Sequence, residues 1–314
     1  MKYRKLGKTG LDVSVLSFGA SSLGSVFRET NEEESIRTVH TAVDLGINLI
    51  DVSPYYGITK AETVLGKAIA QMDRERFILT TKAGRYGDTE FDFSKERIIR
   101  SVDESLKRLQ TDYIDILYLH DIEFAAFVEV VEGGFAALDA VKQSGKVRYI
   151  GVAGLPLTVF EKSLAIKELD SVLSYCHYSL NDTSLLDLVP LLEQHRIGLV
   201  NASPLSMGLL STRPAASWHP APPDIHRICK EAAEYCVSRG VEIAKLAVQY
   251  STANERIPTT LVSTANPENI QKNIQWTDEP MDTELLQEVL DILQPIHNKS
   301  WVSGRPEYNE KANV

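Results

Sequence analysis

Apolar residues along the chain occur in short, nearly continuous runs that alternate with longer amphipathic stretches. Runs that are apolar on both faces are typical of buried strands in a parallel sheet. Eight such runs are predicted to be strands: Val15–Phe18, Ile47–Val52, Phe77–Lys82, Ile114–Leu119, Arg148–Val152, Ser171–Tyr175, Ile197–Ala202 and Thr260–Ser263.

Helical periodicity fills the segments between these runs. The predicted helices are Asn31–Leu45, Lys60–Gln71, Ser94–Leu109, Phe127–Gln143, Leu157–Lys167, Ser184–Gln194, Asp224–Ser251 and Pro267–Gln275, with Thr283–Leu293 as an additional helix near the C-terminus. Gly46 and Gly145 follow two of them, where glycine commonly ends a helix. Ser94 is a suitable N-cap residue.

Eight strands alternating with helices predict a (β/α)8 TIM barrel, formed as a single domain over residues 1–314 with an extra C-terminal helix and tail. A doubly wound open sheet is the alternative. Its best signature, G-x-G-x-x-G after the first strand, is missing, since "SFGASSLGS" contains only Gly19 and Gly24. In a barrel the active site lies at the carboxyl ends of the strands.

Charge and composition narrow the possible partners. The 314 residues carry a formal net charge of −10 without a block of lysine or arginine, which argues against nucleic acid or an anionic membrane as a partner. We see no apolar run long enough to span a membrane and no secretory signal. We therefore expect a cytoplasmic protein acting on a small molecule. No heptad or apolar stripe demands a partner chain, so we expect a monomer, with a dimer as the alternative.

The three cysteines predict neither disulfides nor a metal site. Cys229 and Cys236 are seven residues apart in a helical stretch, which separates them by about 10 Å, beyond the reach of a disulfide. No Cys/His cluster has the spacing of a zinc site. Reduced thiols in a reducing compartment are the expected state.

Three consecutive predicted strands end in chemically active side chains. Asp51 follows "INLI", Lys82 ends "FILTTK" and His120 ends "IDILYLH", while Tyr56 lies in the loop after Asp51. Each has an ordinary structural explanation when considered alone: a loop cap, a solvated lysine, a hydrogen-bonded histidine and a packed ring. Their coincidence at adjacent strand ends favours a catalytic site.

The combination suits proton transfer at an oxygen atom. A neighbouring ammonium, Lys82, stabilises a phenolate, so we expect it to lower the pKa of Tyr56. Asp51 would hold that ammonium in place, and His120 would orient a carbonyl or hydroxyl oxygen. None of these groups donates hydride, so a cofactor must supply that step.

The same residues lie in motifs that resemble the aldo-keto reductase superfamily over essentially the whole chain. The matching stretches are "KLGKTGLDVSVLSFGA", "NLIDVSPYYG", "LTTK", "YIDILYLH", "GKVRYIGVAG", "ASPLSMGLL" and "NPENIQKNI". The resemblance implies a (β/α)8 barrel, a nicotinamide cofactor and a catalytic tetrad at Asp51, Tyr56, Lys82 and His120.

Further stretches resemble the sugar-oxidising members of the superfamily: "GASSLGSVF", "HDIEF", "GLPL", "LSYCHYSLNDTSLLDLVP" and "SWHPAPPDI". This likeness implies oxidation of an aldose at C1 to a lactone with NAD, the aldose being L-galactose, L-fucose, D-arabinose or a related sugar. Carbonyl reduction with NADPH is one alternative. A cofactor-sensing subunit without catalysis is another, which the complete tetrad disfavours.

The cofactor region departs from the common family pattern. Ala202 replaces the aromatic residue that stacks on the nicotinamide, and Tyr175 replaces a glutamine, so we expect Tyr175 or His177 to restore part of the contact. Ser263 and Asn269 replace the lysine and arginine that bind a 2′-phosphate, which favours NAD. The resemblance implies cofactor contacts from Gly19, Ala20, Tyr175, Ser203, Pro204, Leu205, Met207, Ser263, Asn269 and Asn273.

Substrate contacts are expected from Tyr56 and His120 of the tetrad, and from three further residues. Asp121 follows the catalytic histidine in "HDIEF", so its carboxylate is placed to accept hydrogen bonds from a sugar. Glu123 shares that position, although at least one of these acids is expected to be an ordinary loop acid. His177 and Trp301 are the other two expected contacts, with Trp218 and His219 as further residues able to cover a sugar face.

Overall fold

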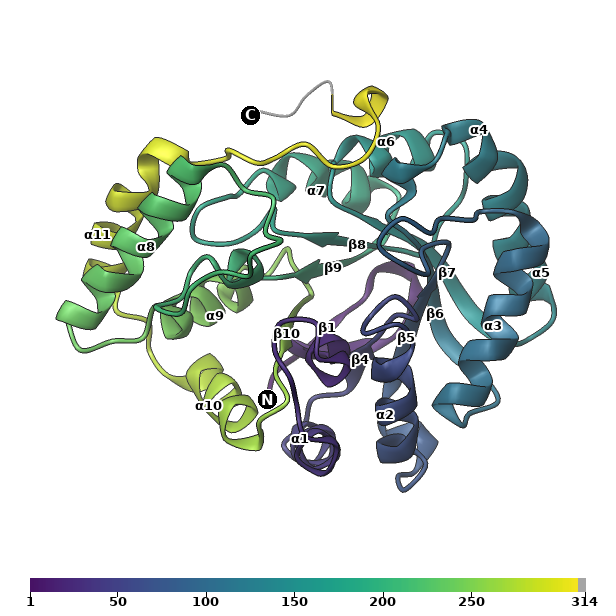
Figure 1. Ribbon diagram of the computed structural model, residues 1–314, viewed down its shortest axis with the longest axis horizontal. Helices are drawn as coiled ribbons and strands as arrows, with labels where there is room; N and C mark the ends of the chain where they lie inside the picture. The colour runs from purple at the N-terminus through teal and green to yellow at the C-terminus, as the bar shows by residue number, and fades with distance from the viewer. Residues whose placement is uncertain (310–314) are drawn as a thin grey trace.

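The computed structural model describes residues 1–309, and at its centre eight parallel strands close into a barrel (Figure 1). Their order around the barrel is β10-β3-β4-β5-β6-β7-β8-β9, which rules out the open-sheet alternative. Each predicted strand is found within a few residues of its expected ends. The strands are β3 Leu16–Gly19, β4 Leu49–Asp51, β5 Ile78–Ala83, β6 Ile114–His120, β7 Val147–Gly154, β8 Ser171–Tyr175, β9 Gly198–Ala202 and β10 Thr259–Ser263.

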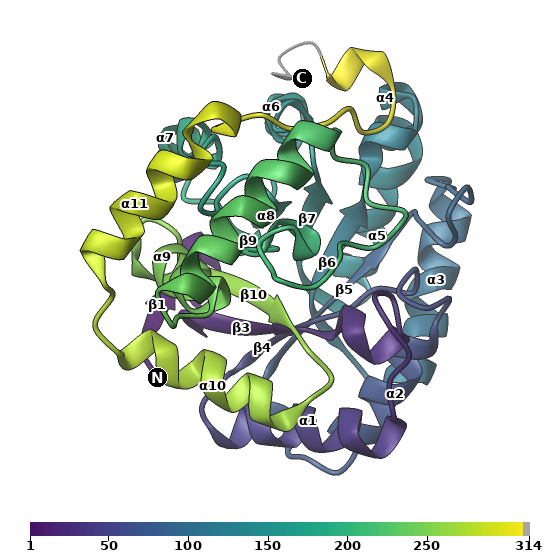
Figure 2. The ribbon, with the colours of Figure 1, turned by 60° about the vertical axis from the view of Figure 1, so that its left-hand side comes forward.

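Helices surround the barrel on the outside (Figure 2). Their apolar faces pack on the outer faces of the strands, as parallel sheets require. The helices are α1 Glu32–Asp44, α2 Lys60–Ile69, α3 Lys95–Leu109, α4 Phe127–Glu129, α5 Ala136–Gln143, α6 Thr158–Leu164, α7 Leu185–Gln194, α8 Pro223–Ser238, α9 Ile243–Ala253, α10 Pro267–Asp278 and α11 Thr283–Leu293.

Two predicted helices are interrupted. The stretch Asp224–Ser251 forms α8 and α9, because Gly240 adopts a φ of +72° and ends the first helix. The stretch Phe127–Gln143 contains a π-helical segment, Val130–Phe135, between α4 and α5. A Cβ at Gly133 would lie 2.3 Å from the carbonyl oxygen of Phe93, so glycine permits this close approach.

An N-terminal hairpin was not predicted. β1 (Tyr3–Lys5) and β2 (Asp12–Ser14) pair antiparallel, and each is too short to show a clear alternation in the sequence. Leu6 and Val13 from this hairpin are fully buried in the cluster of side chains that fills the barrel interior. The barrel is therefore packed, and a site must lie at its rim.

A C-terminal tail follows α11 and crosses to α4 and α6, as both ribbon views show (Figures 1 and 2). Its last described turn buries Tyr308 completely. The Tyr308 hydroxyl donates to the carbonyl oxygen of Ala125 at 3.3 Å, and its own carbonyl oxygen accepts from Thr158. Within residues 1–309, no helix is both long enough and apolar enough to cross a membrane.

Candidate active site

A buried ion pair joins the ends of two neighbouring strands. Lys82 Nζ in β5 donates to Asp51 Oδ2 in β4 at 2.5 Å and to the carbonyl oxygen of Val52 at 2.9 Å. Asp51 Oδ1 accepts from the hydroxyl of Thr80 at 2.6 Å. Because both charged side chains are nearly inaccessible, their geometry is fixed by these bonds.

Tyr56 completes the group from the loop after β4. Lys82 Nζ lies 4.8 Å from the centroid of the Tyr56 ring, and the ring of His120 meets it edge-on at 5.8 Å. The loop is held by backbone contact, because a Cβ at Gly24 would lie 2.6 Å from the carbonyl oxygen of Tyr56. The structure therefore brings the four tetrad residues expected from the sequence into one cluster.

The expected net lowering of the Tyr56 pKa is wrong, although Lys82 acts in the expected direction. Burial raises the pKa of Tyr56, and the charge of Lys82 opposes this effect without overcoming it. Burial also lowers the pKa of Lys82, but the charges of Asp51 and Tyr56 outweigh burial and raise it overall. Lys82 is therefore an ammonium that reduces, rather than cancels, the cost of forming a buried phenolate.

His120 is a neutral imidazole. Burial lowers the pKa of His120 to about 3, with Lys82 and Arg85 acting in the same direction and Asp121 acting against them. Its Nδ1 lies 3.1 Å from the hydroxyl of Ser53, which also accepts the backbone N–H of Tyr55. The Ser53 hydroxyl can therefore donate its proton to Nδ1. The neutral His120 ring then carries its own proton on Nε2, which can donate to a substrate oxygen.

A cavity of about 540 Å³ begins at Asp51 and Tyr56 and extends to α10. Of the ten residues expected to contact a cofactor, eight line it: Gly19, Ser203, Pro204, Leu205, Met207, Ser263, Asn269 and Asn273. Ala20 does not, because its side chain is fully buried. Tyr175 also lies outside the lining; its hydroxyl interacts electrostatically with Asp121, Glu123 and Arg85 instead.

The turn after β9 forms one wall of this cavity in a strained conformation. Ser203, Ser206 and Met207 have φ values of 58°, 47° and 53°, a region that non-glycine residues rarely adopt. Backbone strain of this kind is common where a chain shapes a ligand site. The turn is held by Asn181 Oδ1, which accepts from Ser206 Oγ at 2.7 Å.

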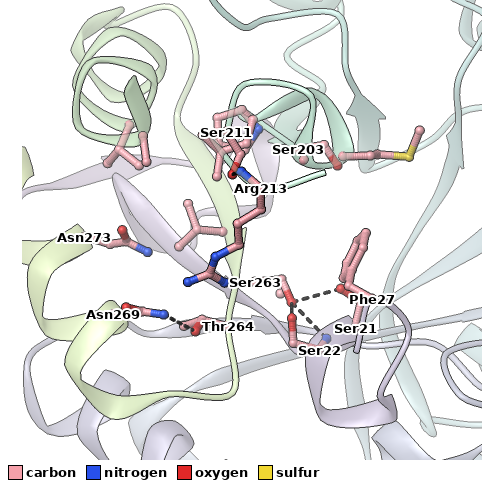
Figure 3. A pocket seen from close by; sticks show the side chains of 18 of the residues that line it. Ser21, Ser22, Phe27, Ser203, Ser211, Arg213, Ser263, Thr264, Asn269 and Asn273 are labelled. Carbon is pink, nitrogen blue, oxygen red and sulfur yellow. Dashed lines mark hydrogen bonds between the residues drawn. The ribbon is translucent and has the colours of Figure 1, made fainter. Parts of the chain in front are cut away.

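Arg213 was not identified from the sequence, although it lines the cavity. Figure 3 shows its side chain extending from the loop after β9 toward Ser263, with Asn269 and Asn273 to one side. Within residues 1–309, its guanidinium has no hydrogen-bond or ion-pair partner. The sequence offered one indication of this role: Arg213 is the first arginine after "ASPLSMGLL", on a loop at the carboxyl rim.

These lining groups fit a nicotinamide dinucleotide. Serine hydroxyls from Ser21, Ser22 and Ser263 are linked by hydrogen bonds of 2.8–2.9 Å on the floor of the cavity (Figure 3). The free guanidinium of Arg213 above them suits a pyrophosphate. Asn266 caps α10 by accepting the N–H of Asn269 at 3.1 Å. The cavity therefore offers hydroxyls and a cation along its length and the tetrad at its end.

The three further residues expected to contact the substrate, Asp121, His177 and Trp301, are all buried. Asp121 Oδ2 pairs with Arg85 Nη1 at 2.6 Å and lies 3.6 Å from His120 Nε2. His177 is buried, with Nδ1 2.9 Å from the hydroxyl of Ser184. Trp301 is only 6% exposed and packs edge-on against His219 at 5.1 Å, so it presents little of its ring to a ligand.

Glu123 is fully buried and holds the C-terminal tail rather than facing solvent. Its Oε1 accepts the hydroxyl of Ser303 and the N–H of Leu155, both at 3.1 Å. The N–H of Arg305 donates to its carbonyl oxygen at 2.8 Å. Burial, together with the charge of Asp121, raises the pKa of Glu123 to about 8.

Comparisons with known proteins agree with this geometry. The model of the Aldo/keto reductase family matches residues 15–294. L-galactose dehydrogenase of Arabidopsis thaliana is 46% identical over 313 residues, which cover 97% of this chain and 98% of that protein. D-arabinose 1-dehydrogenase of Saccharomyces cerevisiae is 34% identical over 256 residues, covering 76% and 75%. The holo form of an aldo-keto reductase from Bacillus halodurans superimposes with a TM-score of 0.78 at 28% identity, covering 99% of this chain and 100% of that chain.

Proposed function

Because the chain belongs to the aldo/keto reductase family, we propose that it is an NAD-dependent aldose 1-dehydrogenase that oxidises L-galactose, or a sugar of related stereochemistry, to its lactone. The observation that carries the proposal is the cluster of Tyr56, Lys82, Asp51 and His120 at the end of a cavity suited to a dinucleotide. The resemblance of the sequence to L-galactose dehydrogenase is supported by 46% identity over nearly the whole of both chains.

The tetrad residues account for the proton chemistry at C1. The sugar binds with its C1 hydroxyl between Tyr56 and the Nε2–H of His120. Tyr56, as phenolate, removes the hydroxyl proton. Lys82 stabilises the negative charge of this phenolate, which burial disfavours. Asp51 keeps Lys82 oriented through the 2.5 Å bond. A bound nicotinamide would accept the hydride that leaves C1.

The preference for NAD rests on the residues near α10. Ser263 and Asn269 offer neutral groups where a 2′-phosphate would need cations. Lys272, the cation on α10 that lines the cavity, lies 3.8 Å from the carboxylate of Glu242 and is partly neutralised by it. We assign Arg213 to the pyrophosphate, which NAD and NADP share.

Carbonyl reduction with NADPH is the second candidate function. It is favoured by Arg28 and Arg213, two arginines that line the cavity and could accommodate an additional phosphate. Equal affinity for NAD and NADP would support this alternative over the proposed dehydrogenase.

The proton-transfer role is tested by the substitution Tyr56→Phe. We expect turnover of an aldose to fall at least about 10³-fold, within the range contributed by general acid–base catalysis, because Tyr56 is the group assigned to accept the proton of the C1 hydroxyl. Cofactor affinity, measured by quenching of tryptophan fluorescence, should change little. The matched control is Tyr55→Phe, which removes a hydroxyl bonded to Asp88 at 3.0 Å and keeps the ring. Retained turnover in Tyr56→Phe would contradict the mechanism.

A further inference from the structure

We propose that Arg85 and Asp121 recognise the hydroxyl on the carbon next to the reacting one, which is the C2 hydroxyl of an aldose. The proposal rests on the proposed aldose oxidation and adds to it a residue pair that selects hydroxylated sugars over simple alcohols and aldehydes. Its basis is the position of this ion pair beside His120.

Asp121 is held at the mouth of the catalytic cluster by its backbone. It directly follows β6 and adopts a φ of 53°, and its N–H donates to the carbonyl oxygen of Ala153 at 2.8 Å. This conformation turns the carboxylate toward the histidine, so that Oδ2 lies 3.6 Å from His120 Nε2 and 2.6 Å from Arg85 Nη1. The carboxylate is thus next to the atom that would bind the C1 oxygen.

Arg85 is fixed by aromatic rings. Its guanidinium carbon lies 3.8 Å from the ring centroid of Tyr55, 5.3 Å from that of Phe91 and 5.4 Å from that of Phe124. Phe91 and Phe124 themselves stack at 4.6 Å. A guanidinium enclosed in this way holds its carboxylate partner in one orientation, which is the preorganisation that a specific hydrogen bond requires.

One oxygen of the pair is left without a bond. Asp121 Oδ1 is buried and has no hydrogen-bond partner among residues 1–309, although Oδ2 is engaged by Arg85. An unsatisfied carboxylate oxygen in a buried site is costly, and a hydroxyl donor from a substrate would remove that cost.

Sugar chemistry supplies the matching donor. When O1 binds between Tyr56 and His120, O2 is attached to the adjacent carbon and lies about one hydrogen-bond length from O1. Because Asp121 Oδ2 lies 3.6 Å from His120 Nε2, the Asp121 carboxylate is close enough to a C1 oxygen bound at His120 to accept from a hydroxyl on the next carbon. A hydrogen bond to a charged group is worth roughly 10- to 100-fold in affinity for the transition state.

The experiment compares kcat/KM for L-galactose with kcat/KM for 2-deoxy-L-galactose in the wild type, Asp121→Ala and Asp121→Asn. We expect a ratio of about 10 to 100 in the wild type, a ratio near 1 in Asp121→Ala and an intermediate ratio in Asp121→Asn, which retains an acceptor oxygen. Taking the ratio within each variant cancels any inactive protein, and comparing the ratios between variants cancels the difference in intrinsic reactivity between the two sugars. If Asp121→Ala is too slow to measure, the ratio in Asp121→Asn is compared with the wild-type ratio instead.

Two controls isolate the effect. The ratio for L-galactose over L-fucose, which is 6-deoxy-L-galactose, should be the same in all three proteins. The variant Asp88→Asn removes an exposed carboxylate that bonds to Tyr55 rather than to His120, and it should keep the wild-type ratio for the 2-deoxy sugar.

A 2-deoxy ratio that is unchanged in both Asp121 variants would overturn the inference and leave the proposed dehydrogenase intact. A wild type that oxidises 2-deoxy-L-galactose as well as L-galactose would do the same. A wild type that oxidises no aldose at all would overturn the proposed function and this inference together.

Discussion

At the scale of single residues, Tyr56 and His120 decide how the rate should depend on pH. Burial raises the pKa of Tyr56, so the phenolate needed for oxidation becomes more populated as pH rises. Burial lowers the pKa of His120 to about 3, so the imidazole is neutral throughout the working range. Neither group titrates near pH 6 to 7, the region in which an ordinary histidine would give an acid limb.

We therefore expect kcat/KM for aldose oxidation to rise continuously from pH 6 to at least pH 9, without an inflection from His120. The cause is the increasing fraction of Tyr56 phenolate. Initial rates in overlapping buffers at constant ionic strength would measure this profile. An activity maximum near neutral pH that disappears in His120→Gln would show instead that the histidine titrates.

The tetrad residues could be predicted from the sequence because each follows an apolar run, and parallel strands bring their carboxyl ends to one rim. Arg85 and Arg213 could not be selected in the same way, because they lie on loops whose paths no periodicity determines. The direction of the Tyr56 pKa shift was also beyond the sequence. It depends on the balance between burial and one nearby charge, which only the packed site defines.

At the scale of elements, two backbone segments cross beside the catalytic loop. The 3-10 helix Ala20–Gly24 lies against the loop that carries Tyr56, and Gly24 and Gly57 are in backbone contact. A Cβ on Gly24 would be 2.6 Å from the carbonyl oxygen of Tyr56. Because backbone atoms cannot rotate away as a flexible side chain does, the crossing fixes the position of Tyr56.

We expect Gly24→Ala to lower kcat for aldose oxidation by about 10-fold or more, because displacing Tyr56 by even about 1 Å disturbs the reacting geometry. Gly145→Ala is the control for an alanine in place of a glycine, since nothing lies within 4 Å of its added Cβ and any effect comes from its φ of +77°. Stability and kcat should be measured for both variants. A wild-type kcat in Gly24→Ala would show that the crossing does not position Tyr56.

Element boundaries illustrate the limits of periodicity at this scale. Thr283–Leu293 was predicted to the residue, and in the structure Asp282 caps this helix by accepting the N–H of Leu285. The break between α8 and α9 was missed, because the amphipathic pattern continues through Gly240. The π-helical segment was also missed, since Gly133 reflects a close approach to Phe93 and Gly134 a close approach to Leu119 rather than a local preference.

At the scale of the whole molecule, the C-terminal tail connects distant parts of the barrel rim. Glu123 lies three residues after the catalytic His120. Its side chain accepts hydrogen bonds from Leu155, directly after β7, and from Ser303 in the tail. Burial and Asp121 together raise the pKa of Glu123 to about 8. A buried carboxyl of this kind favours its neutral form in the folded protein and its charged form in the unfolded chain.

The free energy of unfolding should consequently depend on pH through this residue. The stabilising contribution of neutral Glu123 is fully present below its ordinary pKa of 4.5 and is lost as pH rises through about 8. The glutamine of Glu123→Gln cannot ionise. We therefore expect the melting temperature of this variant, minus that of the wild type, to be larger at pH 9 than at pH 5. Melting curves of both proteins at the two pH values would measure this. Parallel shifts in the two proteins would show that Glu123 does not titrate as described.

The overall architecture was accessible from the sequence because eight apolar runs alternate with helices, and the family motifs cover nearly the whole chain. The tail was accessible only as a segment after the last helix. Its path depends on long-range contacts, such as the burial of Tyr308 beside α6, that no local pattern encodes.

The most direct test of the proposed function is the initial rate of nicotinamide reduction with L-galactose, L-fucose, D-arabinose, D-galactose and D-glucose, each measured with NAD and with NADP. We expect turnover of L-galactose or a sugar of related stereochemistry with NAD, and much weaker turnover with NADP. No turnover of any aldose with either cofactor would contradict the assignment.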